Sequence, residues 1–584
     1  MNLSGFLKEV DRISEKMTRE ELADFIHETA RVLSENGRPA FLERLHGAHG
    51  ENTACGKEPE EGAELSQRFA WVDDMLTRIE EEELCLAGSL NYEYDDWYDG
   101  EEEEFLYEDP DGVADVIVAA GDFVHACVDQ EAWQDGYETA RRLLALPVMA
   151  TGEIADYTDE PMTVEELVSL RLCALDYRRL VLDGIYAAYC ANEPARRAKA
   201  VYEMIESFGR NTITLEMVMQ HGEELPEWDD FLESWTDCLG NIRSACAERL
   251  LTEALELADD PERLLATARK YVLPHPGLYR KYLLSNLHQT ENGKLLAIGK
   301  EALDAIDTKY VIRSQIALLM SRLALEEGLR EEAEQCWVEA LRSDTSVVNL
   351  LRLVTACRDF EAVREQTESI CRAMYEQEEQ NLHGRSVAGE VTENRVSVDT
   401  AYMLAFLNGA FAYVRERGMQ KKKVLGWSGS FMKCGLAVFL LLLLQEEQLG
   451  PGCKEMCRRA AAAVGFEAKK YDEGMDSVTK ETDQDCFWSC LRQWKTRFLP
   501  SKEEKQDYMQ WIEGLVEKRT AGIMEINRRN YYGECAAFIA AVGEVKASWG
   551  DGGEKQRVML SYKQAYSRRR AFHEELRRFG MRDR

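Results

Sequence analysis

The chain has 584 residues, of which 45% are hydrophobic and 30% are charged, so it is long enough to bury the cores of several globular domains. Its formal net charge of −36 repels phosphates, which argues against general binding of nucleic acids or anionic membranes. It contains only 12 prolines, and no segment alternates convincingly between apolar and polar residues. Because proline is disfavoured inside helices, this composition favours long helices, and we predict an all-α fold.

The 16 cysteines are spread through helical patterns and lack the spacing of a disulfide scaffold. The first residues, MNLSGFLKEVDRISEKMTREEL, lack the basic head and apolar core of a signal peptide. We therefore expect reduced thiols and a cytoplasmic location. No Walker-type or dinucleotide-binding glycine loop is present, and we expect no cofactor.

Residues 1–46 are predicted to form N-terminal helices. Thr18 and Glu21 have the spacing of a capping box, in which a hydroxyl and a carboxylate satisfy the free amides at a helix start. Apolar residues then recur at the spacing of one helix face, and Asn36-Gly37 supplies a helix stop before Pro39 opens the next helix.

Residues 47–112 are predicted to form an acidic linker or loop. Between Ile79 and Ala140 there is no lysine or arginine, while 21 aspartates and glutamates occur. Aromatic side chains interleave with these charges, so the segment can be a solvated charge run, a dock for a basic partner or an imitation of nucleic-acid charge. The candidate partner-binding residues are Tyr92, Tyr94, Asp95, Asp96, Trp97, Tyr98 and Asp99.

Residues 113–375 are predicted to form successive helices. Thr163 with Glu166 makes a second capping box, and Asp260-Pro261 marks another helix start. The clearest unit is IALLMSRLALEEGLREEAEQCWVEALRSDT, from Ile316 to Thr345. Four residues of this unit are predicted to pack the repeat. A glycine forms the turn, and in the next helix an aromatic residue shares one face with two small residues, four positions before it and three after it. They are Gly328, Ala333, Trp337 and Ala340.

This unit resembles half of a tetratricopeptide repeat. That family places small residues where paired helices touch and an aromatic residue where the next repeat packs, as Ala333, Trp337 and Ala340 do here. Thr345 departs from the pattern, because the family usually has proline there. The resemblance implies stacked helix pairs with a concave surface that binds a peptide or a partner helix.

Residues 376–398 break the apolar periodicity and are predicted to be a linker before a C-terminal helical block, 399–584, in which Ser501 and Glu504 cap one helix. The segment YKQAYSRRRAFHEELRRFG resembles the helical tail of SWIM-associated proteins, and the whole chain resembles bacterial all-helical repeat proteins. The Cys-x-Cys and Cys-x-His motif that defines SWIM proteins is absent. Basic residues of this tail are a second candidate partner-binding surface: Arg568, Arg569 and Arg570.

The stretch KKKVLGWSGSFMKCGLAVFLLLLLQEEQLG, from Lys421 to Gly450, resembles a membrane anchor and holds a near match to a hydrolase elbow at Ser428. Its uncharged apolar run, residues 435–444, reaches about half of a bilayer's hydrocarbon core. Extending that run to a spanning length buries Lys433 near its middle. An elbow also needs a preceding parallel strand and a glycine after the second variable position, so we predict a buried core helix.

Cysteines four residues apart on two predicted helices are weak candidates for a zinc site: Cys453, Cys457, Cys486 and Cys490. Cysteine is also among the most buried residue types, and the 28-residue separation matches no compact zinc motif. We therefore predict that these thiols lie in the core and that no metal is bound.

These patterns predict a tetratricopeptide-like helical-repeat solenoid with a second C-terminal helical block. The expected function is a non-enzymatic scaffold or adaptor that binds protein partners. Two alternatives stay open. One is an enzyme whose site is assembled from residues distant in sequence. The other is an acidic regulator that imitates nucleic acid or binds basic proteins through residues 80–112.

Overall fold

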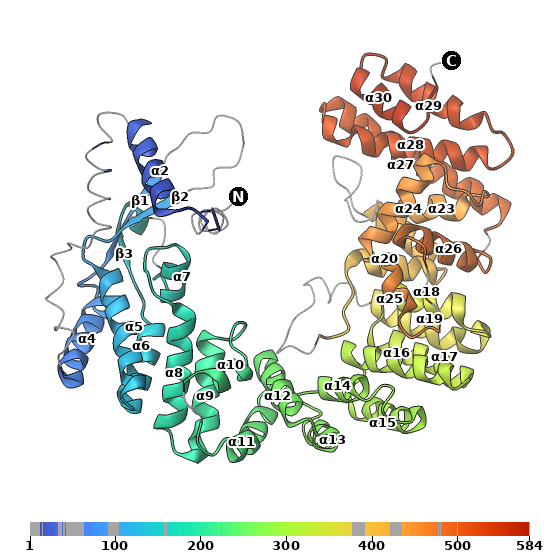
Figure 1. Ribbon diagram of the computed structural model, residues 1–584. Coiled ribbons are helices and arrows are strands. Elements are labelled where there is room, and N and C mark those ends of the chain that lie inside the picture. The colour runs from blue at the N-terminus through green and yellow to red at the C-terminus, as the bar shows by residue number, and fades with distance from the viewer. Residues whose placement is uncertain are drawn as a thin grey trace. The chain divides into compact units, whose positions relative to one another are not determined.

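The computed structural model describes residues 12–13, 16–32, 38, 41, 64–91, 104–156, 160–222, 225–376, 392–420, 435–476, 478, 480–498 and 500–582. Over these residues the chain is mainly helical, as Figure 1 shows, which confirms the all-α prediction. It divides into two compact units, Met1–Asp259 and Asp260–Arg584, and each is described by itself.

The first unit contains helices, a short 3-10 helix (η1) and a three-stranded sheet. The elements are α2 (Arg19–Val32), α4 (Leu65–Glu80), β1 (Leu86–Asn91), β2 (Glu104–Glu108), α5 (Val113–Asp129), α6 (Trp133–Leu144), β3 (Ala150–Gly152), η1 (Glu153–Asp156), α7 (Val164–Ser169), α8 (Tyr177–Ala191), α9 (Pro194–Phe208), α10 (Leu215–Gln220), α11 (Trp228–Gly240) and α12 (Ala245–Ala258).

Helix α5 lies at the centre of the first unit's core. It packs against α4, α6 and α8, and the side chains of Val116, Ala120 and Phe123, three or four residues apart, are fully buried. Further along the chain α8 packs on α9, α9 on α11, and α11 on α12. The unit is thus a series of helices, each packed on its neighbours.

The sheet corrects two of our predictions. Strand β1 pairs antiparallel with β2 and parallel with β3, in the order β2-β1-β3, although no strand was expected. The prediction of a linker or loop over residues 47–112 is wrong for residues 65–80, 86–91 and 104–108, which form α4, β1 and β2. Buried side chains such as Leu76, Ile79 and Leu86 tie this acidic region to the core.

The predicted helix starts are confirmed. In the capping box of α7, the Glu166 amide donates to the Thr163 hydroxyl and the Thr163 amide donates to the Glu166 carboxylate. Thr18 and Glu21 make the same pair of bonds before α2, and Asp260 caps α13. The stop at Asn36-Gly37 and the start at Pro39 lie outside the described residues.

The second unit contains helices, one of them a short 3-10 helix (η4). They are α13 (Pro261–Lys270), α14 (Gly277–Ser285), α15 (Asn292–Ala305), α16 (Val311–Glu326), α17 (Arg330–Ser343), α18 (Val347–Ala356), α19 (Phe360–Glu376), α20 (Val398–Leu407), α21 (Phe411–Gln420), α23 (Ala437–Leu443), α24 (Pro451–Ala463), α25 (Ala468–Asp472), α26 (Asp483–Lys495), α27 (Lys502–Glu525), η4 (Arg529–Tyr531), α28 (Tyr532–Ala547), α29 (Glu554–Ala565) and α30 (Arg570–Arg578). The predicted capping box of α27, Ser501 with Glu504, is present.

From α14 to α20 the helices of the second unit stack as pairs. Consecutive helices pack together, as α15 does on α16 and α16 on α17, and so do alternate helices: α14 on α16, α17 on α19 and α18 on α20. Contacts of both kinds are typical of a helical repeat, in which each pair covers the apolar face of the next.

The segment from α25 to α26 returns to the helix pairs that precede it. Both helices pack on α18, and α19 packs on α20 across the predicted linker. Of that linker, residues 377–391 lie outside the described part. Its end is anchored, because the Asn394 side chain accepts from the Thr345 amide at 2.9 Å and donates to the Arg342 carbonyl at 3.0 Å. The predicted domain boundaries stay predictions.

The apolar run that resembles an anchor forms α23. Every side chain from Leu436 to Leu444 is buried, and α23 packs on α24, α27 and α28 of the same chain. Over the residues that the structure describes, no helix has both the length and the apolar character needed to cross a membrane. The core-helix prediction is therefore confirmed for residues 435–444, while Ser428 lies outside the described residues.

Candidate partner-binding groove

A groove of about 900 Å³ lies in the second unit between α14, α16 and residues 468–483. Arg280 and Leu284 come from α14. The other side is formed by α25 and the segment that follows it. The remaining lining residues are Gln315, Leu318, Leu319, Arg322, Glu326, Ala468, Lys469, Asp472, Glu473, Gly474, Met475, Asp476, Val478, Glu481 and Asp483.

Helical periodicity explains what α16 contributes to the groove. Gln315, Leu319 and Arg322 are spaced by three and four residues, so they lie on one side of the helix. Other residues of α16, including Ile316 and Ala324, are fully buried. The helix thus uses one face for the core of its own unit and leaves another facing the groove.

Gly474 fixes the opposite wall onto α16 and α17. Its carbonyl accepts from the Ser321 hydroxyl at 2.9 Å and from the Trp337 indole N–H at 3.1 Å. The Gly474 φ angle is +77°, and a Cβ there would overlap the Ser321 hydroxyl and lie 2.9 Å from the Leu318 carbonyl oxygen. Glycine is required here for both reasons.

Arg352 on α18 holds the preceding turn of this wall. Its fully buried guanidinium donates to the Tyr471 carbonyl at 3.0 Å, and to the Lys470 carbonyl and the Asn349 side chain. Burial lowers the pKa of Arg352 to about 10, with nearby Glu473 opposing the shift, so the side chain stays charged at neutral pH. A charged donor in an apolar interior binds carbonyl oxygens strongly, which makes the wall rigid.

The groove combines charges of both signs with exposed apolar surface. Arg280 on α14 and Asp476 on the opposite wall have no partner among the described residues, while Arg322 pairs with Glu326 at 3.2 Å. The Leu284 side chain is 39% exposed and Val478 is 82% exposed. Among the residues that the structure describes, no histidine, cysteine or serine lines the groove. Such a surface has the mixed polar and apolar character of surfaces that bind polypeptides.

The predicted repeat residues lie beside this groove. Gly328, with a φ of +74°, is in the turn between α16 and α17, and Ala333, Trp337 and Ala340 of α17 are fully buried. The Trp337 indole donates to Gly474, which is distant in sequence, and the Arg330 guanidinium lies 4.9 Å from its ring centre. The aromatic side chain therefore helps to position one groove wall.

Of the two predicted charged surfaces, the structure describes only the basic one. The acidic aromatic residues 92–99 lie outside the described residues, between β1 and β2. Arg568 and Arg570 are exposed at the start of α30. Arg569 is engaged within the unit, because it donates to the Asn527 side chain at 2.5 Å and to the Met524 carbonyl at 2.8 Å.

The four candidate zinc cysteines are buried thiols. The Cys453 and Cys457 thiols donate to the Ala541 and Gln484 carbonyls. Burial raises the pKa of Cys457 to about 12, so its thiolate form is suppressed at neutral pH. Cys486 and Cys490 interact with one another on α26. Nowhere in the described ranges do three histidine, cysteine or acidic side chains gather as a metal site.

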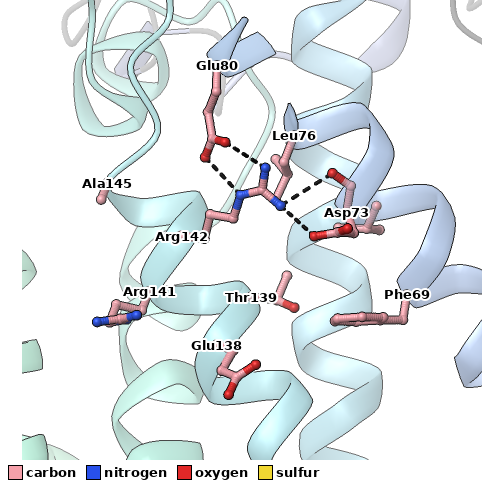
Figure 2. Close-up of a pocket in the computed structure, with 10 residues that line it drawn as sticks. Phe69, Asp73, Leu76, Glu80, Glu138, Thr139, Arg141, Arg142 and Ala145 are labelled. Carbon is pink, nitrogen blue, oxygen red and sulfur yellow. Dashed lines mark hydrogen bonds and ion pairs between the residues drawn. The ribbon is translucent and has the colours of Figure 1, made fainter. Parts of the chain in front are cut away.

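A smaller cavity of about 490 Å³ lies between α4 and α6 in the first unit, and Figure 2 shows its residues. At one end Arg142 pairs with Glu80 and Asp73, both at 2.6 Å. The hydrogen bond from Arg142 lowers the pKa of Glu80, and Glu80 raises that of Arg142. These charges already satisfy one another, so we interpret the cluster as a clamp between α4 and α6.

One buried polar cluster of the first unit carried no signal in the sequence. Asp183 on α8 is buried, with one carboxylate oxygen 2.7 Å from Nε2 of His221 and the other 3.4 Å from Nδ1 of His125. The three residues come from positions far apart in the chain, so only the fold brings them together. The pairs link α8 to α5 and to the end of α10.

Comparisons with protein-family models and with curated proteins found no match to this chain. The tetratricopeptide and SWIM-tail resemblances therefore stay predictions.

Proposed function

We propose that this protein is a non-enzymatic interaction module that binds a segment of a partner polypeptide in the groove between α14, α16 and residues 468–483. The observation that carries the proposal is the groove itself. At about 900 Å³ it is large enough for several side chains, and its walls are held by Gly474 and Arg352. Rigid walls reduce the ordering cost of binding, which favours recognition of a flexible segment.

The charges of the groove define the kind of segment that fits. The α14 and α16 side presents Arg280 and Arg322, while the opposite wall presents exposed Glu473 and Asp476. A partner segment with an apolar side chain against Leu284, acidic residues toward the arginines and basic residues toward the carboxylates would complement all three features. We propose the cytoplasm as the location, which the free thiols of the described cysteines support.

Selection from a random peptide display library tests the proposal, using the full chain as the target. The enriched peptides should share an apolar residue flanked by charges of both signs. One of them, the selected peptide, is then labelled, and its binding is measured by fluorescence anisotropy. Leu284→Glu should weaken that binding at least about tenfold, because it places a carboxylate on the apolar part of the groove.

The matched control is Leu329→Glu, since Leu329 is 43% exposed and does not line the groove. This variant should bind the selected peptide as the wild-type protein does. If no peptide family is enriched, or if both variants bind equally well, the groove is not a polypeptide-binding site.

A further inference from the structure

A second cavity of the second unit, about 440 Å³, lies between α27, α28 and α29. Helix α28 packs against both α27 and α29, so its buried Ile539 and Val542 form an apolar base between them. The remaining lining residues are Glu513, Val516 and Glu517 of α27, and Val558, Ser561, Tyr562, Ala565 and Tyr566 of α29.

Over the part of the chain that the structure describes, the charged residues lining this cavity are two glutamates. Glu513 pairs with Lys546 at 2.9 Å. Glu517 is exposed and has no ion pair or hydrogen bond among the described residues. An anion would be repelled here, and a neutral apolar ligand would strip water from Glu517 without replacing its hydrogen bonds. The charge distribution therefore favours a cation.

Two tyrosines stand opposite these carboxylates. Tyr562 and Tyr566 are four residues apart on α29 and so lie on the same face. Burial, followed by the nearby charge of Glu517, raises the pKa of both phenols, so both stay neutral near pH 7. Neutral tyrosine rings attract lysine and arginine through their electron-rich faces. The apolar base suits the alkyl stem of a lysine or arginine side chain, and the aromatic wall and the carboxylate suit its charged head.

We propose that this cavity binds the cationic side chain of an arginine or lysine carried by a basic polypeptide. The alkyl stem lies over Ile539 and Val542, the charged head pairs with Glu517, and Tyr562 contributes its ring face. The cavity shares no lining residue with the groove in which we propose peptide binding, so the two proposals are tested independently. The chain's net charge of −36 also attracts basic partners over a distance.

The test uses the full chain with isoleucine methyl groups labelled for NMR, because Ile539 lies in the cavity and reports on its occupancy. The probes are acetyl-arginine amide and acetyl-citrulline amide, which have nearly the same shape but differ in charge. The arginine probe should shift the Ile539 methyl signal in a saturable manner, and the citrulline probe should bind at least about tenfold more weakly.

Two glutamate-to-glutamine variants test whether the Glu517 carboxylate binds the charged group of the arginine probe. Glu517→Gln should weaken arginine binding about tenfold, since it removes the free carboxylate of the cavity. Glu525→Gln is the control, because Glu525 is exposed on the same helix and does not line the cavity. Ala565→Trp should fill the cavity and abolish the Ile539 shift. Equal binding of citrulline and arginine, or full binding by Glu517→Gln, would overturn the proposal.

Discussion

Helices α23 and α14 of the second unit both carry leucines, but they use them differently. In α23 the four leucines from Leu440 to Leu443 are buried within the unit. In α14 Leu278 and Leu283 are buried, whereas Leu284 is 39% exposed and faces the groove. The comparison teaches that α23 uses its apolar surface for the unit's own stability, while α14 leaves part of its apolar surface in the groove that we propose as a binding site.

The largest expected effect is a difference in the free energy of unfolding when the same substitution, leucine to alanine, is made in each of the two helices. Leu440→Ala should lower the free energy of unfolding by about 2–5 kcal/mol, because it leaves a cavity in a closed core. Leu284→Ala should lower it by less than about 1 kcal/mol, because that side chain is already partly in water. Denaturant titrations of the two variants measure both values. Equal losses would contradict the assignment of α23 to the core and α14 to the groove.

Lys495 makes the stability of the core around α23 depend on pH. Its ammonium donates to the Leu441 carbonyl at 3.2 Å and also to the Leu444 carbonyl. Burial lowers the pKa of Lys495 to about 8 from an ordinary value of 10.5, and the charge of Lys505 adds to the shift. Between these values the unfolded chain binds a proton that the folded chain does not, so this residue's contribution to stability rises with pH.

Comparison with Lys495→Met isolates this contribution from those of other titrating groups. As pH rises from about 8 to 10.5, the stability of the wild-type protein should increase relative to that of the variant by up to about 3 kcal/mol. Below pH 8 the difference should be constant, because Lys495 is protonated in both states. Denaturant titrations across this range measure it. A difference that does not change with pH would mean that Lys495 is solvated in the folded protein.

Gly474 connects the stability of the unit with the groove. Gly474→Ala should cost about 1–3 kcal/mol and should weaken binding of the selected peptide, because the wall must move away from Ser321 and Leu318. Gly465→Ala is a close control, since Gly465 has a φ of +60° but open space around its Cβ position. Unfolding and anisotropy measurements compare the two. Equal losses in both variants would show that backbone conformation alone requires glycine at residue 474.

The smallest effect concerns the exposed charges of the groove. Asp476→Lys should weaken binding of the selected peptide by about twofold to fivefold, because exposed ion pairs contribute little. Raising the salt concentration should reduce this difference. Glu365→Lys makes the same charge change on α19, outside the groove, and should leave binding unaltered. Anisotropy titrations at two salt concentrations provide the check, and an equal loss in Glu365→Lys would assign the effect to the net charge.

Much of the helical fold could be predicted from local patterns. Capping pairs such as Thr163 with Glu166 act within one helical turn, and a ten-residue apolar run has few places to lie except in a core. The small sheet could not be predicted, because β1 is LAGSLN and lacks clear alternation. Its pairing with β2 and β3 depends on tertiary packing rather than on strand propensity.

The groove could not be predicted for a different reason. Arg280, Gln315 and Asp476 are ordinary residue types and lie far apart in the sequence, so no local spacing links them. The sequence predicts Trp337 as a packing residue, but its donation to Gly474 depends on the return of the segment around Gly474 to α16 and α17. The same argument explains why the pairs of Asp183 with His125 and His221 could not be predicted.

The most direct test of the central claim is to map where the selected peptide lies on the full chain. A benzophenone group at its apolar position is cross-linked to the protein by light, and the attachment sites are identified by mass spectrometry. We expect attachment within α14, α16 and residues 468–476, and its loss when Gln315→Trp obstructs the groove. Attachment mainly to other parts of the chain, unchanged by Gln315→Trp, would contradict the account.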